Sequence, residues 1–177
     1  MKWKATLRKY YKKAVLDKGT PEYIARGWAL GMFCGLAIPF GAQLMFSIPL
    51  SFLLKGSKIG ATLGTLVTNH VTIFFIYPFQ CWVGNKLIGG ELSMNYVNEV
   101  MQGVVESGKL ESLMKLGMQL VISFFVGGFL FALIAAPPTY FLTKKLVVLF
   151  REKRMKRKQE RAIARAKAAS GGKDKNE

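Results

Sequence analysis

Acidic side chains and histidine are scarce in this sequence, and their scarcity excludes several kinds of active site. The 177 residues include 10 Asp or Glu and 1 His against 26 Lys or Arg, a formal net charge of +16. No Asp, Glu, Lys or Arg lies within 27–54, 59–85 or 116–143. Metal cages and proton relays need several carboxylates or imidazoles close together. We therefore expect no catalytic residue, no metal site, no cofactor and no enzyme activity.

Cysteine is also rare, and no removable signal peptide is expected. Cys34 and Cys81 both lie in the uncharged stretches, where a thiol acts as a small hydrophobe and a disulfide framework has no role. No small-residue cleavage site of the usual kind follows the first apolar stretch promptly. We expect that stretch to stay part of the protein.

The uncharged stretches are long enough to cross a membrane. Each exceeds the roughly 20 apolar residues that a spanning helix needs, and 51% of the sequence is hydrophobic. The basic residues gather near the two ends of the chain, which places both termini in the cytoplasm by the positive-inside rule. We predict an all-α integral protein of the bacterial inner (cytoplasmic) membrane.

Proline and glycine divide this membrane domain, residues 20–150, into short or broken helices, some of them re-entrant. Thr20 should cap the first helix, Pro39 should end it, and the pair Pro137-Pro138 should break the last one. We expect helices at about 21–38, 42–54, 58–68, 70–88, 92–106, 110–136 and 139–150.

Two cytoplasmic termini require an even number of crossings. The simplest arrangement is a re-entrant hairpin at 24–54, one outward crossing within 59–88 and one inward crossing within 117–143. The alternative, in which 24–54 spans the membrane, stays open. Outside the membrane domain, 1–19 has the pattern of a basic amphipathic helix on the membrane surface, and the alternative is a solvated charged arm. Residues 151–177 should form a basic cytoplasmic tail with a disordered end.

Two series of glycines at a spacing of four residues predict close helix packing. Small residues at this spacing let membrane helices approach each other, and we favour packing over ligand binding as their role. The two series are offset by 29 residues, which indicates a weak internal repeat or chance. They are Gly27, Gly31 and Gly35, then Gly56, Gly60 and Gly64.

The two expected helix breaks are the candidate ligand site. The first break contains Pro39, Gly41 and Gln43. In the second, Asn69 should be the N-cap of a helix that begins at His70. Free N–H groups and the positive end of a helix dipole favour an anion or a phosphate headgroup. The alternative is that the polar side chains, including Thr72 beside His70, only satisfy backbone groups that the breaks set free.

Two further segments suggest partners. Residues 92–105 have one apolar stripe among polar residues, and they lie in a net-acidic connection (89–115) that we place outside the cytoplasm. They could dock a protein partner. The basic tail has no interleaved aromatic residues for stacking on bases, so we expect contact with anionic lipids rather than nucleic acid.

Residues 20–78 resemble a family of bacterial membrane proteins, the domain of unknown function 2062 family. The matching residues are Thr20-Pro21, Ile24-Ala25, Gly27, Ala29, Gly31, Phe33, Gly35, Pro39, Gly41, Gln43, Lys55, Gly64-Thr65, Asn69, Thr72 and Pro78. His70 departs from the family pattern, which has proline at this position. Some members are fused to glycosyltransferases that use polyprenyl-phosphate carriers, so the resemblance implies a link to lipid-bound glycans.

The leading hypothesis is a homo-oligomeric membrane protein that binds or translocates an anionic lipid, such as a polyprenyl-phosphate, or a small anion at the two breaks. The alternative is a structural or scaffold subunit in which the breaks only pack and 92–105 docks a partner. The two differ in whether Gln43→Ala and Asn69→Ala remove binding while leaving the fold intact.

Overall fold

The computed structural model describes residues 19–90, 93, 95 and 117–171. All regular structure in these residues is helical, which confirms the all-α prediction for them. The predicted surface helix at 1–19 apart from Gly19, the end of the tail from 172, and the segment 92–106 apart from positions 93 and 95 lie outside the described residues. The elements are α2 (Pro21–Ala37), α3 (Gln43–Leu53), α4 (Lys58–Gly64), the 3-10 turn η1 (Thr65–Val67), α5 (Ile73–Leu87) and α8 (Met118–Gly171).

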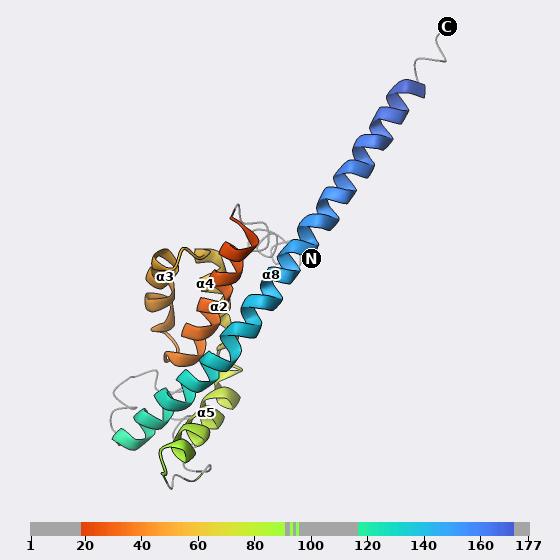
Figure 1. The fold of residues 1–177 in the computed structure, drawn as a ribbon. Helices are drawn as coiled ribbons and strands as arrows, with labels where there is room; N and C mark the ends of the chain where they lie inside the picture. Colours follow the sequence, from red (N-terminus) through yellow and green to blue (C-terminus); the bar gives the residue numbers. More distant parts are fainter. Residues whose placement is uncertain (1–18, 91–92, 94, 96–116, 172–177) are drawn as a thin grey trace.

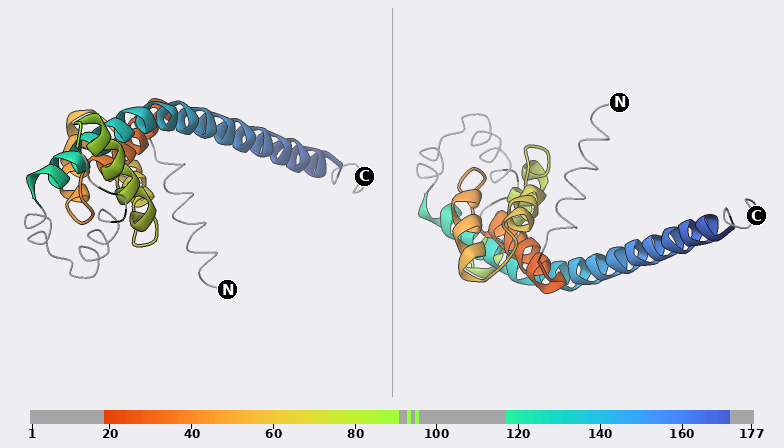
Figure 2. Two further views of the ribbon diagram at one scale, coloured as in Figure 1. Left: turned by 90° about the horizontal axis from the view of Figure 1, so that it is seen from below. Right: turned by 90° about the horizontal axis from the view of Figure 1, so that it is seen from above.

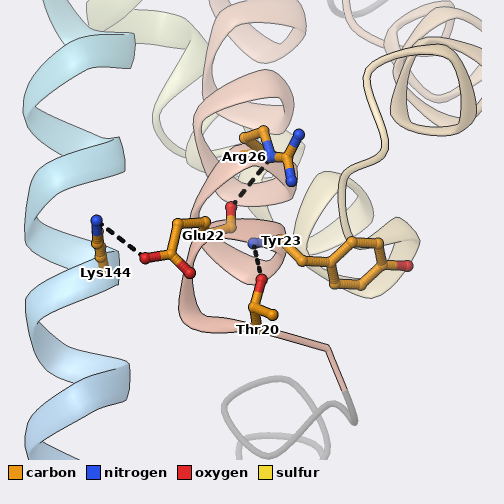
Figure 3. Close-up of polar contacts among 5 residues, drawn as sticks. All are labelled: Thr20, Glu22, Tyr23, Arg26 and Lys144. Atoms are coloured by element: carbon orange, nitrogen blue, oxygen red, sulfur yellow. Dashed lines mark hydrogen bonds and ion pairs between the residues drawn. The ribbon is translucent and has the colours of Figure 1, made fainter.

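Local sequence sets the start and end of α2. Thr20 is the N-cap, and its hydroxyl accepts a hydrogen bond from the Tyr23 N–H at 3.2 Å (Figure 3). Pro21 occupies the first turn, where its missing N–H costs nothing. The helix ends at Ala37 because Pro39 disfavours helical geometry at the residue before it, and Ile38 is extended.

The two glycine series face each other and hold α2 against α4. Gly31 lies against the backbone of Ala61 and Gly64, and a Cβ at Gly64 would be 2.6 Å from the Trp28 carbonyl oxygen. Gly27 meets the backbone of Ser57 in the same way. Later residues of α2 meet later residues of α4, so the two helices run parallel. The packing role favoured for these glycines fits this geometry.

Helix α8 is a spine along which α5 and α2 pack one after the other (Figure 1). The α5 end of this interface joins the Gln119 side chain to the Asn85 side chain at 3.3 Å. Further along α8, Phe129 meets Phe33 of α2 edge to face, with ring centroids 5.6 Å apart. Beyond these contacts the C-terminal part of α8 extends away from the other helices (Figure 2).

The predicted break at Pro137-Pro138 is wrong, because α8 runs through both prolines without interruption. Helix α2 packs against α8 on both sides of the pair, through Phe129 before it and through an ion pair to Lys144 after it. This packing of α2 on α8 thus offsets the loss of the two backbone hydrogen bonds that the prolines cannot donate. The Thr139 hydroxyl also donates to the Ala135 carbonyl at 2.7 Å, as polar side chains do near prolines in membrane helices.

The second break also differs from its prediction. Helix α5 begins at Ile73 with Thr72 as its N-cap, not at His70 with Asn69 as the cap. Residues 70–72 form a turn instead. His70 has no proline-like restriction on its backbone, and Asn69 closes the turn with its side chain before the helix starts.

Surface polarity is inverted on α3, and α5 buries polar as well as apolar side chains. On α3 the buried side chains are polar, with Gln43 4% and Ser47 0% exposed, whereas Met45 is 76% and Leu53 78% exposed. On α5 Gln80 is buried and Phe75 is 75% exposed. Among the described helices, only Met118–Ala164 is long and apolar enough to cross a membrane, by length and composition.

Candidate functional site: the junction of the two helix breaks

The two breaks lie side by side. Residues 38–42 and 68–72 each follow a helix, pass through a bend and a turn, and lead into a new helix. The Phe40 and His70 rings meet edge to face with centroids 4.9 Å apart. The corresponding backbone positions are 30 residues apart, so Pro39 matches Asn69, and the offset of 29 does not hold at the breaks. We call this meeting point the junction.

Gln43 and Thr68 connect the two breaks in the interior. The Thr68 hydroxyl lies 2.9 Å from the Gly35 carbonyl oxygen and 2.9 Å from the side-chain amide of Gln43. Thr68 is fully buried and Gln43 nearly so. The Gln43 atom that faces the hydroxyl is the side-chain oxygen, Oε1, and a hydroxyl has one hydrogen, so Thr68 donates to only one of these two oxygens at a time.

Asn69 and Thr72 satisfy the backbone of the second break. The Asn69 side-chain oxygen accepts from the N–H groups of Val71 and Thr72, at 2.9 and 3.2 Å. The Thr72 hydroxyl accepts from the Asn69 N–H at 2.8 Å and contacts the Val67 carbonyl oxygen at 2.8 Å. This geometry favours the structural interpretation of these two residues. His70 is exposed, and its ring contact is with Phe40.

The first break lacks such a cap. Neither Ala42, the N-cap of α3, nor Thr72, the N-cap of α5, makes a side-chain capping bond, but the first break also has no counterpart of the Asn69 side chain that accepts turn N–H groups. Among the described residues, the N–H groups of Gly41, Gln43 and Leu44 have no hydrogen-bond acceptor. Gly41 has a φ of 98° with open space around its Cβ position, so only a residue tolerant of left-handed geometry suits it. The start of α3 therefore presents several unsatisfied donors together.

Tyr77 is a junction residue that sequence reasoning missed. Its hydroxyl oxygen accepts the Phe40 N–H at 2.7 Å, and its ring packs edge to face on Phe124 of α8 at 4.9 Å. Because the oxygen accepts this bond, the hydroxyl hydrogen remains available to donate. The aromatic run around Tyr77 hid it, since one phenol in an apolar stretch resembles ordinary packing.

Gln80 was also missed, and it fixes α5 to both α2 and α8. Its side-chain nitrogen donates to the carbonyls of Leu36 and Phe124, each at 3.1 Å. Two carbonyl partners fix the amide orientation, because only the nitrogen can donate. The side-chain oxygen is then buried without a partner. A glutamine within an uncharged stretch was the signal that could have identified it.

The charged edge of the bundle lies at the other end of α2 (Figure 3). Glu22 pairs with Lys144 of α8 at 3.0 Å, and Arg26 reaches the Glu22 and Leu54 carbonyls at 3.4 and 3.3 Å. The hydrogen bond from Lys144 lowers the pKa of Glu22, and the same bond raises the pKa of Lys144. Both side chains are partly exposed, so the pair orients α2 more than it stabilises the fold.

Comparison with known proteins gives a family but no close relative. No curated protein matches the chain, and no solved structure does. A family model described as "Uncharacterized protein conserved in bacteria (DUF2062)" matches residues 4–156, which is most of the chain. This confirms the resemblance and extends it well beyond residues 20–78. The protein is a member of this bacterial family.

Proposed function

We propose that the chain is a multi-pass protein of the bacterial inner membrane that binds an anionic group at the junction, as a step in lipid or anion transfer. The inverted polarity of α3 and the exposed aromatic side chains of α5 support the membrane assignment. In water, the exposure of the apolar side chains Met45, Leu53 and Phe75 would be unfavourable. The burial of the polar side chains Gln43 and Ser47 would also be unfavourable. In hydrocarbon the same arrangement is favourable.

The helix arrangement fits the expected topology. Helices α2 and α3 form the hairpin, α4 with η1 and α5 form a broken outward crossing, and the uncharged part of α8 forms the inward crossing. Gln80 meets α8 at Phe124 and Gly128. Gly128 lies about 15 Å along the helix from Met118 and about 24 Å from Lys144, at 1.5 Å per residue. The junction would then lie well inside the hydrocarbon layer, as in transporters with broken helices.

The unsatisfied N–H groups at the start of α3 are the observation on which the proposal depends. In hydrocarbon each unpaired backbone donor costs several kcal/mol, so an acceptor must be supplied from outside the described residues. The N–H groups of Gly41, Gln43 and Leu44, with the Tyr77 hydroxyl nearby, would suit the oxygens of a phosphate or a small anion. A polyprenyl-phosphate headgroup belongs to this chemical class.

A scaffold role is the second candidate, and a separate observation favours it. Asn69 and Thr72 satisfy backbone groups of the second break within the chain itself, and the glycines on α2 and α4 lie against the backbone of the facing helix. If the first break were satisfied by a second copy of the chain, the junction would be part of an oligomer interface. We do not expect catalysis in either case.

Thermal unfolding of the purified full-length protein in detergent tests binding. We expect phosphatidylglycerol to raise the melting temperature of the wild type more than phosphatidylcholine does, because only the first carries a net negative charge. Gly41→Val should remove this difference. Gly89→Val is the matched control, since Gly89 also has a positive φ of 70° and open space but lies away from the junction. Both variants should lose about 1–3 kcal/mol from backbone strain.

Equal lipid stabilisation in the wild type and Gly41→Val would refute binding at the first break. Gln43→Ala adds a second comparison, because it removes the contact with Thr68. Loss of lipid stabilisation in Gln43→Ala with a retained fold would support the binding role. Lipid stabilisation unchanged in both junction variants would leave the scaffold role as the better proposal.

A further inference from the structure

Buried polar side chains continue from the junction in both directions. In the part of the chain that the structure describes, they form an inner group on α3 and at the two ends of α4 with η1, and an outer group between α5 and α8. The inner group is Gln43, Ser47, Ser51, Ser57, Thr65 and Thr68, and the outer group is Gln80, Asn85 and Ser123.

The inner group follows one face of α3. Gln43, Ser47 and Ser51 are spaced by four residues, so they share a face, and all three are buried. The Ser51 hydroxyl donates to the Ile48 carbonyl at 2.6 Å, and the Ser51 carbonyl accepts the Gly56 N–H at 2.8 Å. Ser47 differs, because its hydroxyl is fully buried without any hydrogen-bond partner.

The outer group lies between α5 and α8. The Asn85 amide nitrogen donates to the Gly90 carbonyl at 2.9 Å, and the Ser123 hydroxyl donates to the Gln119 carbonyl at 2.6 Å. Gln80 is nearest the junction, and its side-chain oxygen is the second buried atom without a partner. A polar atom that has no partner in a buried site costs free energy, so such an atom is a candidate ligand contact.

The end of α2 joins the two groups. The Gly35 carbonyl contacts the Thr68 hydroxyl of the inner group, and the next carbonyl, of Leu36, accepts from Gln80 of the outer group. Consecutive carbonyls of one helix turn therefore connect the two polar groups. One unpartnered atom lies on each side of this connection, at Ser47 and at Gln80.

We propose that the two groups line a route by which the polar head of an anionic ligand passes the junction from one membrane surface to the other. This inference rests on the proposed binding function and names its path. The side chains of both groups carry only hydroxyls and amides, which can contact hydroxyl or phosphate oxygens without holding a charge tightly. A lipid headgroup and free phosphate share this chemistry.

The route is closed in this structure, because its side chains are buried, and α3 carries three of the six residues of the inner group. Residues with left-handed backbone angles flank α3 at both ends, Gly41 with a φ of 98° and Lys55 with a φ of 49°. Short segments of this kind absorb the angle changes of a hinged helix. Movement of α3 would expose Ser47, and movement of α5 against α8 would expose Ser123.

Cysteine labelling in proteoliposomes tests the route. The full-length chain would carry Cys34→Ala and Cys81→Ala, which remove both native thiols, and then single cysteines by Ser47→Cys or Ser123→Cys, which are nearly isosteric. Phe46→Cys and Phe125→Cys are matched controls, because these neighbours on the same two helices are exposed on the apolar surface, 50% and 48%.

We expect a membrane-impermeant thiosulfonate to modify the cysteines at positions 47 and 123 at least about tenfold faster than those at 46 and 125, since the thiolate forms in a hydrated path and not in lipid. Phosphatidylglycerol should slow both route positions if the ligand is a lipid, and inorganic phosphate should do so if it is a free anion. Protection by neither would overturn the ligand assignment.

Modification at only one of the two route positions would overturn a path through both halves, and modification at neither would overturn the route entirely. These outcomes are separate from the test of the proposed function. If Gly41→Val loses the lipid stabilisation and the cysteines at 47 and 123 do not react, the ligand binds at the break but does not pass along the route. If those cysteines react and Gly41→Val keeps the lipid stabilisation, binding at the break is refuted.

Discussion

The contact between α2 and α4 gives the sharpest quantitative prediction, through Gly64→Ala. A Cβ at Gly64 would lie 2.6 Å from the Trp28 carbonyl oxygen and 2.9 Å from the Gly31 Cα and the Met32 nitrogen. All three neighbours are backbone atoms, so no side chain can move aside, and the two helices must separate. Overpacking of this kind costs about 1–3 kcal/mol.

The substitution also removes a glycine from a helix, which by itself gains up to about 1 kcal/mol. The clash should exceed this gain, and we expect a net loss of about 1–2 kcal/mol for Gly64→Ala. In a chain of this size that corresponds to a fall of roughly 2–8 °C in melting temperature. Circular dichroism of the purified protein in one detergent is a suitable assay.

Gly60 and Gly35 provide graded comparisons within the same interface. A Cβ at Gly60 would meet the Trp28 side chain at 3.0 Å, and one at Gly35 would meet the Val67 side chain at 3.1 Å. The other near neighbours are backbone atoms at 3.1–3.2 Å, farther away than the 2.6–2.9 Å at Gly64, so the clash should be smaller and the gain in helix propensity should nearly cancel its cost. A higher melting temperature for Gly64→Ala than for the wild type would refute the assigned packing of α2 against α4.

Three further predictions concern other contacts. Because the pKa of Glu22 is lowered in the folded state, its pair with Lys144 stabilises the fold fully above the unfolded-state pKa of about 4.3. This stabilisation is lost as the pH falls through the lower folded-state pKa. Acid should therefore lower the melting temperature of the wild type more than that of Lys144→Met. Thr68→Val should lower the free energy of unfolding by about 1–3 kcal/mol because a buried carbonyl loses its donor, and an effect no larger than that of Thr62→Val would contradict this. Pro137→Ala should leave helix content in circular dichroism unchanged, since α8 is already continuous, and a clear gain would mean that the proline breaks the helix.

The sequence alone determined the features that depend on neighbouring residues. Thr20 and Pro21 start a helix, and Pro39 ends it, because a cap and a missing N–H act within one turn. The glycine spacing indicated close packing because only small residues let backbones approach. The presence of two breaks near Pro39 and Asn69, although not the start of α5, and the family could likewise be read from the residues between 20 and 78.

Only the tertiary structure decided which of these features meet. It placed the two glycine series against each other and brought Phe40 to His70, which depends on how α2 and α4 align and not on either segment alone. It kept α8 continuous through Pro137, because packing on both sides of the proline outweighs the lost hydrogen bond. It also gave Tyr77 its contact with the junction and Gln80 its contacts with α2 and α8, since their partners lie 37 and 44 residues away along the chain.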